Sequence, residues 1–220
     1  MGLTQLKINF SPEEYLAFER DAKTKHEYLD GEVYAMAGGS PSHNAISFNA
    51  TVTIGSQIKG RNCRGYTADQ KVRTDPQDLF SYPDITIVCG DPKFHDEKKD
   101  VILNPTVIIE VLSPTTEAYD RSEKFARYRT IQSLRDYLLI AQDRPCIEHF
   151  VRQKGKRLWL YNVETELSSS LWIESIKCDL KLADVYELVE FPAKRPLLFE
   201  VVEKLPTPSV KKSKSKKRND

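Results

Sequence analysis

Two short β-branched runs place the strongest constraint on this chain: residues 82–88, "YPDITIV", and residues 106–112, "TVIIEVL". Both are bounded by proline or glycine and rich in Ile and Val, which predicts two central strands buried on both faces. Each run also carries an acid, Asp84 directly after Pro83 and Glu110 toward the far end. A buried carboxylate without a partner is costly, so these two acids require a counter-charge.

A divalent cation would supply that charge. Two carboxylates about 4 Å apart repel each other by roughly 4 kcal/mol at an effective dielectric constant near 20. Oxygen ligands suit Mg²⁺ or Mn²⁺, which activate water and stabilise charge on a phosphodiester. We therefore predict Asp84 and Glu110 as metal ligands, with Mg²⁺ (or Mn²⁺) as cofactor. The alternative for Asp84 is a purely structural turn or cap after Pro83.

An amine near the carboxylates would help to position or deprotonate the attacking water. The residue on the same strand face two positions after Glu110 is Leu112, which has no amine. Lys124 is the candidate, because at 100° per residue it lies near the centre of an apolar helical arc and should point inward. The alternative is a side chain that reaches out to solvent from a helix start. The arc consists of Phe125, Tyr128, Ile131 and Leu134.

Capping and turn signals predict the other elements. Residues 11–20 and 40–60 begin with Ser-Pro and predict capped helices. The Asp30–Gly31 pair predicts a hairpin turn. Asp120 is expected to cap the helix that carries Lys124, with Glu123 completing a capping box. This mixed order predicts an α/β fold with one central sheet flanked by helices.

Composition and charge set the domain limits. We predict one domain over residues 1–191 and an extension over 192–220 that ends in a basic, disordered tail. The last ten residues hold six bases and one acid, so the rest of the chain is near −4 although the whole is +1. The overall charge thus offers no support for DNA binding, although the tail could contact phosphates.

Cysteine usage and hydropathy indicate a cytoplasmic protein with no membrane association. No apolar run approaches the ~18 residues that span a bilayer, and the start lacks the features of a signal peptide. The four cysteines form no CxxC pair, so we expect reduced thiols. These cysteines are Cys63, Cys89, Cys146 and Cys178.

Several ordered motifs together resemble one known family. They are "PD" at residues 83–84, "EVLSP" at 110–114 and "DRSEKFARY" at 120–128, preceded by "HEYLDGEVYAM" and "SHN". This combination, within residues 8–191, resembles the Uma-two family of restriction endonucleases, itself similar to a branch of the PD-(D/E)XK nuclease superfamily.

The resemblance implies a restriction-endonuclease-like mixed central sheet flanked by helices, and Mg²⁺-dependent DNA cleavage. The runs on either side of Lys154 and Gly155 add a predicted β-hairpin extension. The resemblance also implies metal-binding roles for Asp84 and Glu110. Leu112 stands where the superfamily usually has a lysine, and the resemblance suggests that Lys124 supplies the amine instead.

Four further residues are candidates with plain alternatives. Glu27 matches an acidic position of the family and is a possible third catalytic acid, or an exposed charge on an edge strand. His43 could contact phosphate or serve as a capping residue. Ser113 could bond a ligand water or shape the turn before Pro114. Tyr128 shares the face of Lys124, where packing is the more frequent role.

The leading functional hypothesis is a metal-dependent endonuclease that cleaves DNA. A catalytically weakened DNA-binding or assembly module that keeps the fold is the alternative, because the lysine is displaced and the body is acidic. A third hypothesis is a metal-dependent hydrolase of RNA or a nucleotide. A homodimer is expected only by analogy with enzymes that cut both strands.

Overall fold

The computed structural model describes residues 4–7, 9–75 and 79–192. Its larger sheet has the order β12-β11-β10-β9-β7-β4, in which only β9 and β10 are parallel. The strands are β4 (Cys63–Thr67), β7 (Ile85–Cys89), β9 (Val107–Val111), β10 (Asp136–Ile140), β11 (Ile147–Arg152) and β12 (Trp159–Glu164). All five residues of β9 and of β10 are buried, so the expected central strand near residues 106–112 is confirmed.

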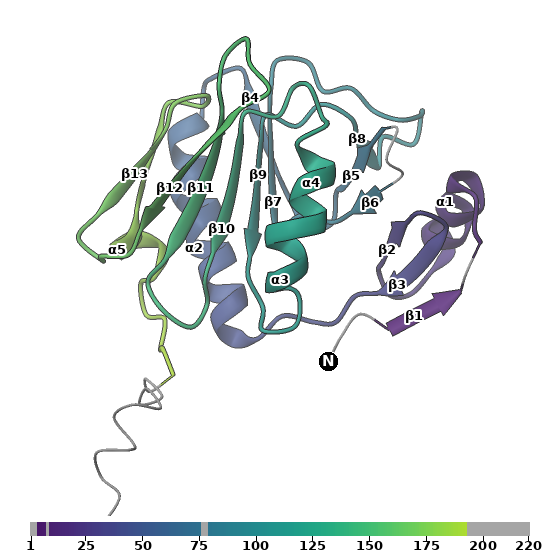
Figure 1. The fold of residues 1–220 in the computed structure, drawn as a ribbon, viewed down its shortest axis with the longest axis horizontal. Helices are drawn as coiled ribbons and strands as arrows, with labels where there is room; N and C mark the ends of the chain where they lie inside the picture. The colour runs from purple at the N-terminus through teal and green to yellow at the C-terminus, as the bar shows by residue number, and fades with distance from the viewer. Residues whose placement is uncertain (1–3, 8, 76–78, 193–220) are drawn as a thin grey trace, which may run out of the picture.

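Helices cover both faces of this sheet (Figure 1). On one face, α2 (Pro41–Ile58) packs Ile46 and Ile54 against Val107 and Leu138. On the other, the helix after β9 packs Tyr128 against Ile108 and its neighbours. Two short strands, β13 (Ser170–Ile173) and β14 (Cys178–Lys181), and the helix α5 (Leu182–Val185) complete the α2 side.

A second six-stranded sheet has the order β1-β3-β2-β6-β5-β8, so the expectation of a single central sheet is wrong. Its strands are β1 (Thr4–Lys7), β2 (His26–Leu29), β3 (Glu32–Ala35), β5 (Lys71–Thr74), β6 (Leu79–Ser81) and β8 (Val101–Ile102). Helix α1 (Pro12–Asp21) packs on it. The chain passes from β6 into β7 through Pro83, which has no N–H to donate to a ladder and therefore ends the pairing of one sheet before the other begins.

The local signals at the first helix and hairpin are confirmed. Ser11 and Glu14 form a complete capping box at the start of α1. Asp30 and Gly31 have φ values of 48° and 92°, the left-handed region that a tight hairpin turn requires. Ser40 caps α2 by accepting from the His43 N–H.

The helix that carries Lys124 begins earlier than predicted. It consists of α3 (Glu117–Tyr119), the π-helical turn η1 (Asp120–Lys124) and α4 (Phe125–Tyr128). The predicted cap at Asp120 and its capping box with Glu123 are therefore wrong. The helix starts earlier because the Ser113 carbonyl accepts a hydrogen bond from the Glu117 N–H at 2.9 Å. Asp120 lies inside the helix and is buried.

Only the first part of the predicted apolar helical arc, Phe125 and Tyr128, is helical. Ile131 and Leu134 lie beyond the end of α4, yet both are buried in the same cluster as Tyr128. Lys124 is nevertheless buried, as the arc predicted.

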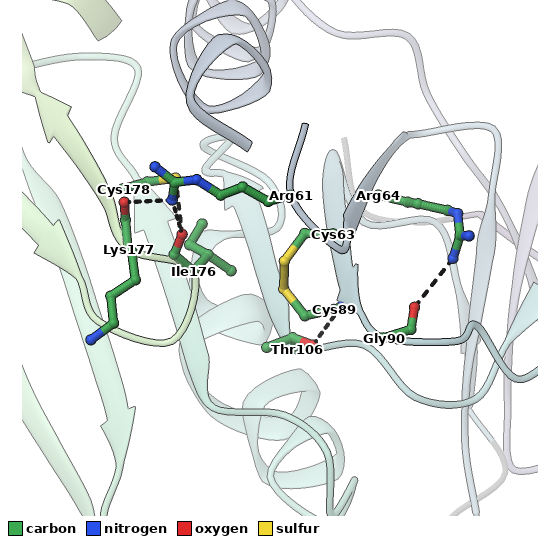
Figure 2. The surroundings of a disulfide bond; sticks show 9 residues. All are labelled: Arg61, Cys63, Arg64, Cys89, Gly90, Thr106, Ile176, Lys177 and Cys178. Atoms are coloured by element: carbon green, nitrogen blue, oxygen red, sulfur yellow. Dashed lines mark hydrogen bonds between the residues drawn. A yellow bond between two sulfur atoms is a disulfide. The ribbon is translucent and has the colours of Figure 1, made fainter. Parts of the chain in front are cut away.

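Two of the four cysteines are bonded, so the expectation of reduced thiols is wrong for Cys63 and Cys89. The two residues are direct partners in the β4–β7 ladder, and a sulfur–sulfur bond joins them (Figure 2). The Cys89 N–H donates to Thr106 Oγ1 at 2.9 Å and so connects this pair to the start of β9. Cys146 and Cys178 are free and buried.

No helix in the described residues combines the length and the apolar character needed to cross a bilayer. Most of the predicted extension, with its basic tail, lies at 193–220, outside the described residues.

We expect reduction of the Cys63–Cys89 bond to lower the free energy of unfolding by about 3 kcal/mol, because the bond closes a loop of 26 residues. Urea unfolding with and without a thiol reductant measures this loss. Cys63→Ser/Cys89→Ser should reproduce it, whereas Cys146→Ser should leave the effect of the reductant unchanged. Equal stability of the oxidised and reduced protein would contradict the prediction.

Candidate active site at the junction of the two sheets

Asp84 lies in the segment that joins the two sheets, between β6 and β7. Its Oδ2 accepts a hydrogen bond from the Val111 N–H at 2.7 Å and lies 3.4 Å from His43 Nε2. Val111 directly follows Glu110, so this one bond places the two predicted metal ligands side by side. The Asp84 side chain is 15% exposed, which leaves it accessible to a ligand.

Glu110 is buried on β9, opposite Leu139 of β10. Its Oε1 accepts from the Tyr128 hydroxyl at 3.0 Å and lies 3.1 Å from Lys124 Nζ. The side chain therefore points toward the helix layer that carries Tyr128 and Lys124.

Lys124 is the central cation of this cluster. Its Nζ lies 3.1 Å from Oε1 of Glu110, 3.1 Å from Oε1 of Glu27 and 3.5 Å from Oδ1 of Asp120. All four side chains are buried. Glu27 lies on β2, an internal strand, so the alternative of an exposed edge charge is excluded for it.

Burial and mutual repulsion shape the protonation of the cluster. Burial is the main cause that raises the pKa of Glu110 to about 8; Lys124 opposes the rise, while Asp120, Asp84 and Glu27 add to it. Burial acts to lower the pKa of Lys124, but Glu110 and Glu27 outweigh it and raise that pKa well above its usual value. Lys124 is therefore an ammonium ion at neutral pH.

His43 stands next to Asp84 at the first turn of α2. Burial acts to lower its pKa, but the hydrogen bond and charge of Asp84 outweigh this, and the pKa is raised. The ring nitrogen Nδ1 is buried and has no hydrogen-bond partner among the described residues. The sequence thus placed His43 near the site, although phosphate contact remains a prediction.

Tyr128 and Ser113 differ in their relation to the site. The Tyr128 hydroxyl bonds both Glu110 and Ser81 Oγ, at 3.0 and 2.7 Å, so this core residue orients a carboxylate. Ser113 Oγ instead bonds Thr116 N–H and the hydroxyls of Thr115 and Thr116. These contacts match the turn-shaping alternative for Ser113.

The donor set suits a hard divalent ion that keeps part of its water shell. Asp84 Oδ1 and Glu110 Oε2 have no hydrogen-bond partner among the described residues, which leaves one carboxylate oxygen of each residue for a ligand. Within the same residues, no group of three or more His, Cys, Asp or Glu is arranged to hold a metal ion. Magnesium commonly binds proteins through one or two carboxylates and takes its other ligands from water and phosphate, so two donors fit it.

Two features of the site were missed in the sequence. Asp120 was assigned to a helix cap, although its i,i+4 spacing from Lys124 predicts contact on one helix face. Buried Glu19 accepts from the hydroxyl of Tyr82, two residues before Asp84, at 2.7 Å and from the His26 N–H at 2.9 Å. An acid on the apolar face of α1 was the available signal for Glu19.

Comparison with known proteins decides the family. The model of the Uma2 family, described as "Putative restriction endonuclease", matches residues 12–181. The chain belongs to the Uma2 family. An uncharacterised protein of Synechocystis sp., sll1609, is 35% identical over 161 residues, covering 70% of this chain and 90% of that protein. A second one from the same organism, slr1290, is 34% identical over 182 residues, covering 82% and 93%.

The fold has a solved relative. The crystal structure of "a putative nuclease belonging to DUF820" from Anabaena variabilis matches this Uma2 protein with a TM-score of 0.67. The match covers 82% of this chain and 99% of that one at 18% identity, which confirms the restriction-endonuclease-like α/β architecture expected from the sequence.

We expect Glu110→Gln to weaken the pH dependence of stability of the metal-free protein. The pKa of Glu110 is higher in the folded protein than its ordinary 4.5, so its contribution to stability is full at low pH and falls as the pH rises toward about 8. Between about pH 5 and about pH 9, the melting temperature of the wild type should drop by roughly 5 °C more than that of the variant.

Thermal melts in EDTA, with Glu166→Gln at an exposed acid after β12 as control, measure this difference. A variant that melts far below the wild type at every pH would show instead that Glu110 is a structural ion-pair partner.

Proposed function

We propose that this Uma2 protein is a metal-dependent endonuclease that hydrolyses DNA phosphodiester bonds. The observation that carries the proposal is the contact between the buried Lys124 ammonium and Glu110. The residue after Glu110, Val111, donates its N–H to Asp84 and so brings that carboxylate to the same place. Three distant segments thereby bring two carboxylates and an amine together at the junction of two sheets. The family description supports nuclease activity and DNA as its substrate.

Asp84 and Glu110 would hold Mg²⁺ or Mn²⁺, each through the carboxylate oxygen that has no partner in the described residues. When bound, such an ion stabilises negative charge on the phosphate and lowers the pKa of a bound water. Burial, with a smaller contribution from the neighbouring acids, raises the pKa of Glu110, and a divalent charge beside it would favour its ionised form.

Lys124 acts as a charged hydrogen-bond donor. Its raised pKa means that it cannot accept a proton near neutral pH, so positioning the water or stabilising charge on the phosphate is its role, rather than deprotonation. Glu27 and Asp120 hold the ammonium in place, and Tyr128 fixes the Glu110 oxygen that faces it. His43 Nε2 lies 3.4 Å from Asp84 Oδ2 and helps to orient that carboxylate.

We expect purified protein to nick or linearise supercoiled plasmid in Mg²⁺ or Mn²⁺, and to stop when EDTA is added. Asp84→Asn, Glu110→Gln and Lys124→Met should each lower the rate by about 100-fold or more, because each removes a charge on which the reaction depends. Gel electrophoresis of a plasmid time course measures the rate.

The matched control for the carboxylate variants is Asp91→Asn, an exposed acid beyond the other end of β7, which should cleave as the wild type does. Cleavage that persists in Asp84→Asn and Glu110→Gln would refute the site. DNA binding without any cleavage would favour the non-catalytic module, and cleavage of RNA alone would favour the third hypothesis.

The proposed homodimer is tested by light scattering on the same samples.

A further inference from the structure

A large basic cavity lies at the end of the main sheet opposite the carboxylates. Its volume is about 1200 Å³, and its described lining comes from the α4–β10 loop, the β11–β12 hairpin, the β13–β14 turn and Asp75 directly after β5. Asp136, at its floor, is opposite Val107 where β9 begins, whereas Glu110 is opposite Leu139, three residues further along. At ~3.3 Å per residue the floor is ~10 Å from the level of Glu110 along the strands.

Positive charge is concentrated in this cavity. Its described lining has six bases against three acids, in a chain whose body is acidic. The bases are Arg129, Arg135, Arg152, Lys154, Lys156 and Arg157. All of them except Arg152 are exposed, and within the part of the chain that the structure describes none of the six forms an ion pair.

Two of the three acids are already engaged. Asp136 Oδ1 lies 2.7 Å from His149 Nε2, and both residues are buried. Glu174 accepts from the Trp172 indole N–H at 2.6 Å and pairs with Lys177. The lining bases therefore face the cavity with little neutralising charge from the protein.

Arg152 gives the cavity a fixed floor. Its guanidinium donates to the carbonyls of Leu134, Ile131 and Arg129 at 2.7, 2.9 and 2.6 Å, and lies 4.5 Å from the centre of the Trp159 ring. Burial, and then the charge of Arg135, lower the pKa of Arg152, so the cations at this end of the sheet repel one another. An anion in the cavity would relieve that repulsion.

We propose that this cavity binds phosphate groups of the DNA backbone that flank the segment held at the carboxylates. This assignment rests on the proposed function for its source of phosphates. The chemistry fits a run of phosphates better than a single anion, because the bases come from separate loops around a wide cavity. Uncharged donors, among them Gln132 and Ser175, line the same walls and suit sugar and phosphate oxygens.

The test is equilibrium binding of a fluorescent duplex of ~25 base pairs, in EDTA and over a range of salt concentrations. The cavity variant is Lys154→Glu/Lys156→Glu/Arg157→Glu. The control is Lys23→Glu/Lys59→Glu/Lys181→Glu, which makes the same change in net charge at exposed lysines outside the cavity.

We expect the cavity variant to bind at least ~10-fold more weakly and to lose about 2 from the salt-dependence slope, while the control stays within ~3-fold of the wild type. Equal losses in both variants would overturn the proposal, because only net charge would then matter. Unchanged binding by the cavity variant would overturn it as well.

A second arm separates DNA from a free phosphate ligand. Inorganic pyrophosphate or ATP could bind the wild-type protein but not the cavity variant, while the two proteins bind the duplex equally. In that case the cavity binds a small phosphate ligand and the DNA assignment is wrong. Thermal melts check that the variants fold. If the glutamate substitutions prevent folding, Lys154→Gln/Lys156→Gln/Arg157→Gln is measured in the same binding experiment instead.

Failure of this proposal is distinguishable from failure of the nuclease assignment, because binding in EDTA needs no catalysis. Normal duplex binding by the cavity variant, in a protein that cleaves plasmid, would refute the cavity alone. Weak binding by that variant, in a protein that never cleaves, would refute the nuclease assignment alone.

Discussion

The burial of Lys124 between Glu110 and Glu27 is the interaction on which the rest of the site depends. An ammonium removed from water is tolerated only when its charge is matched, and here three buried acids surround it. The same arrangement keeps an excess of negative charge at the sheet junction, since Asp84 adds a fourth acid. A cation is the simplest way to satisfy that excess, which connects the stability of the fold to the proposed chemistry.

The junction itself explains why the site forms where it does. Pro83 ends one sheet, and the next residue, Asp84, accepts from the backbone of Val111 in the other. Glu27 comes from the first sheet, Glu110 from the second and Lys124 from the helix that covers them. Glu110 and Lys124 come from consecutive elements, but Glu27 comes from a segment about 80 residues earlier, so the full cluster exists only when both sheets are packed together.

The π-helical turn of the helix carries both Asp120 and Lys124 of the buried cluster. A π-helical turn inserts a residue into the helical ladder, and such turns occur often at functional sites. In this chain it spans Asp120 to Lys124 and places both side chains on the buried side. This turn also explains the displaced lysine. The amine reaches Glu110 from a neighbouring element, while Leu112 on the strand packs in the core.

The burial of Glu110 and Lys124 was predictable because each interrupts an apolar pattern, whereas the metal-binding and catalytic roles of Asp84, Glu110 and Lys124 stay predictions. Asp84 and Glu110 interrupt β-branched runs and Lys124 interrupts an apolar arc, so burial of a charge was visible without coordinates. The capped start of α1 and the Asp30–Gly31 turn were also predictable, because the chemistry that fixes them is local.

Only the tertiary structure decided the second sheet, the helix start at Glu117, the Cys63–Cys89 bond and the basic cavity. The second sheet and the β4–β7 pair that joins the two cysteines depend on pairing between strands far apart in the chain. A short hydrophobic run does not reveal which strand it will pair with. The prediction of Asp120 as a cap is wrong because the sequence alone does not show where the turn after β9 starts the helix. The sequence thus determined that Glu110 and Lys124 are buried, and the packing of the two sheets, which joins segments far apart in the chain, determined that Glu27 and Asp120 are buried with them.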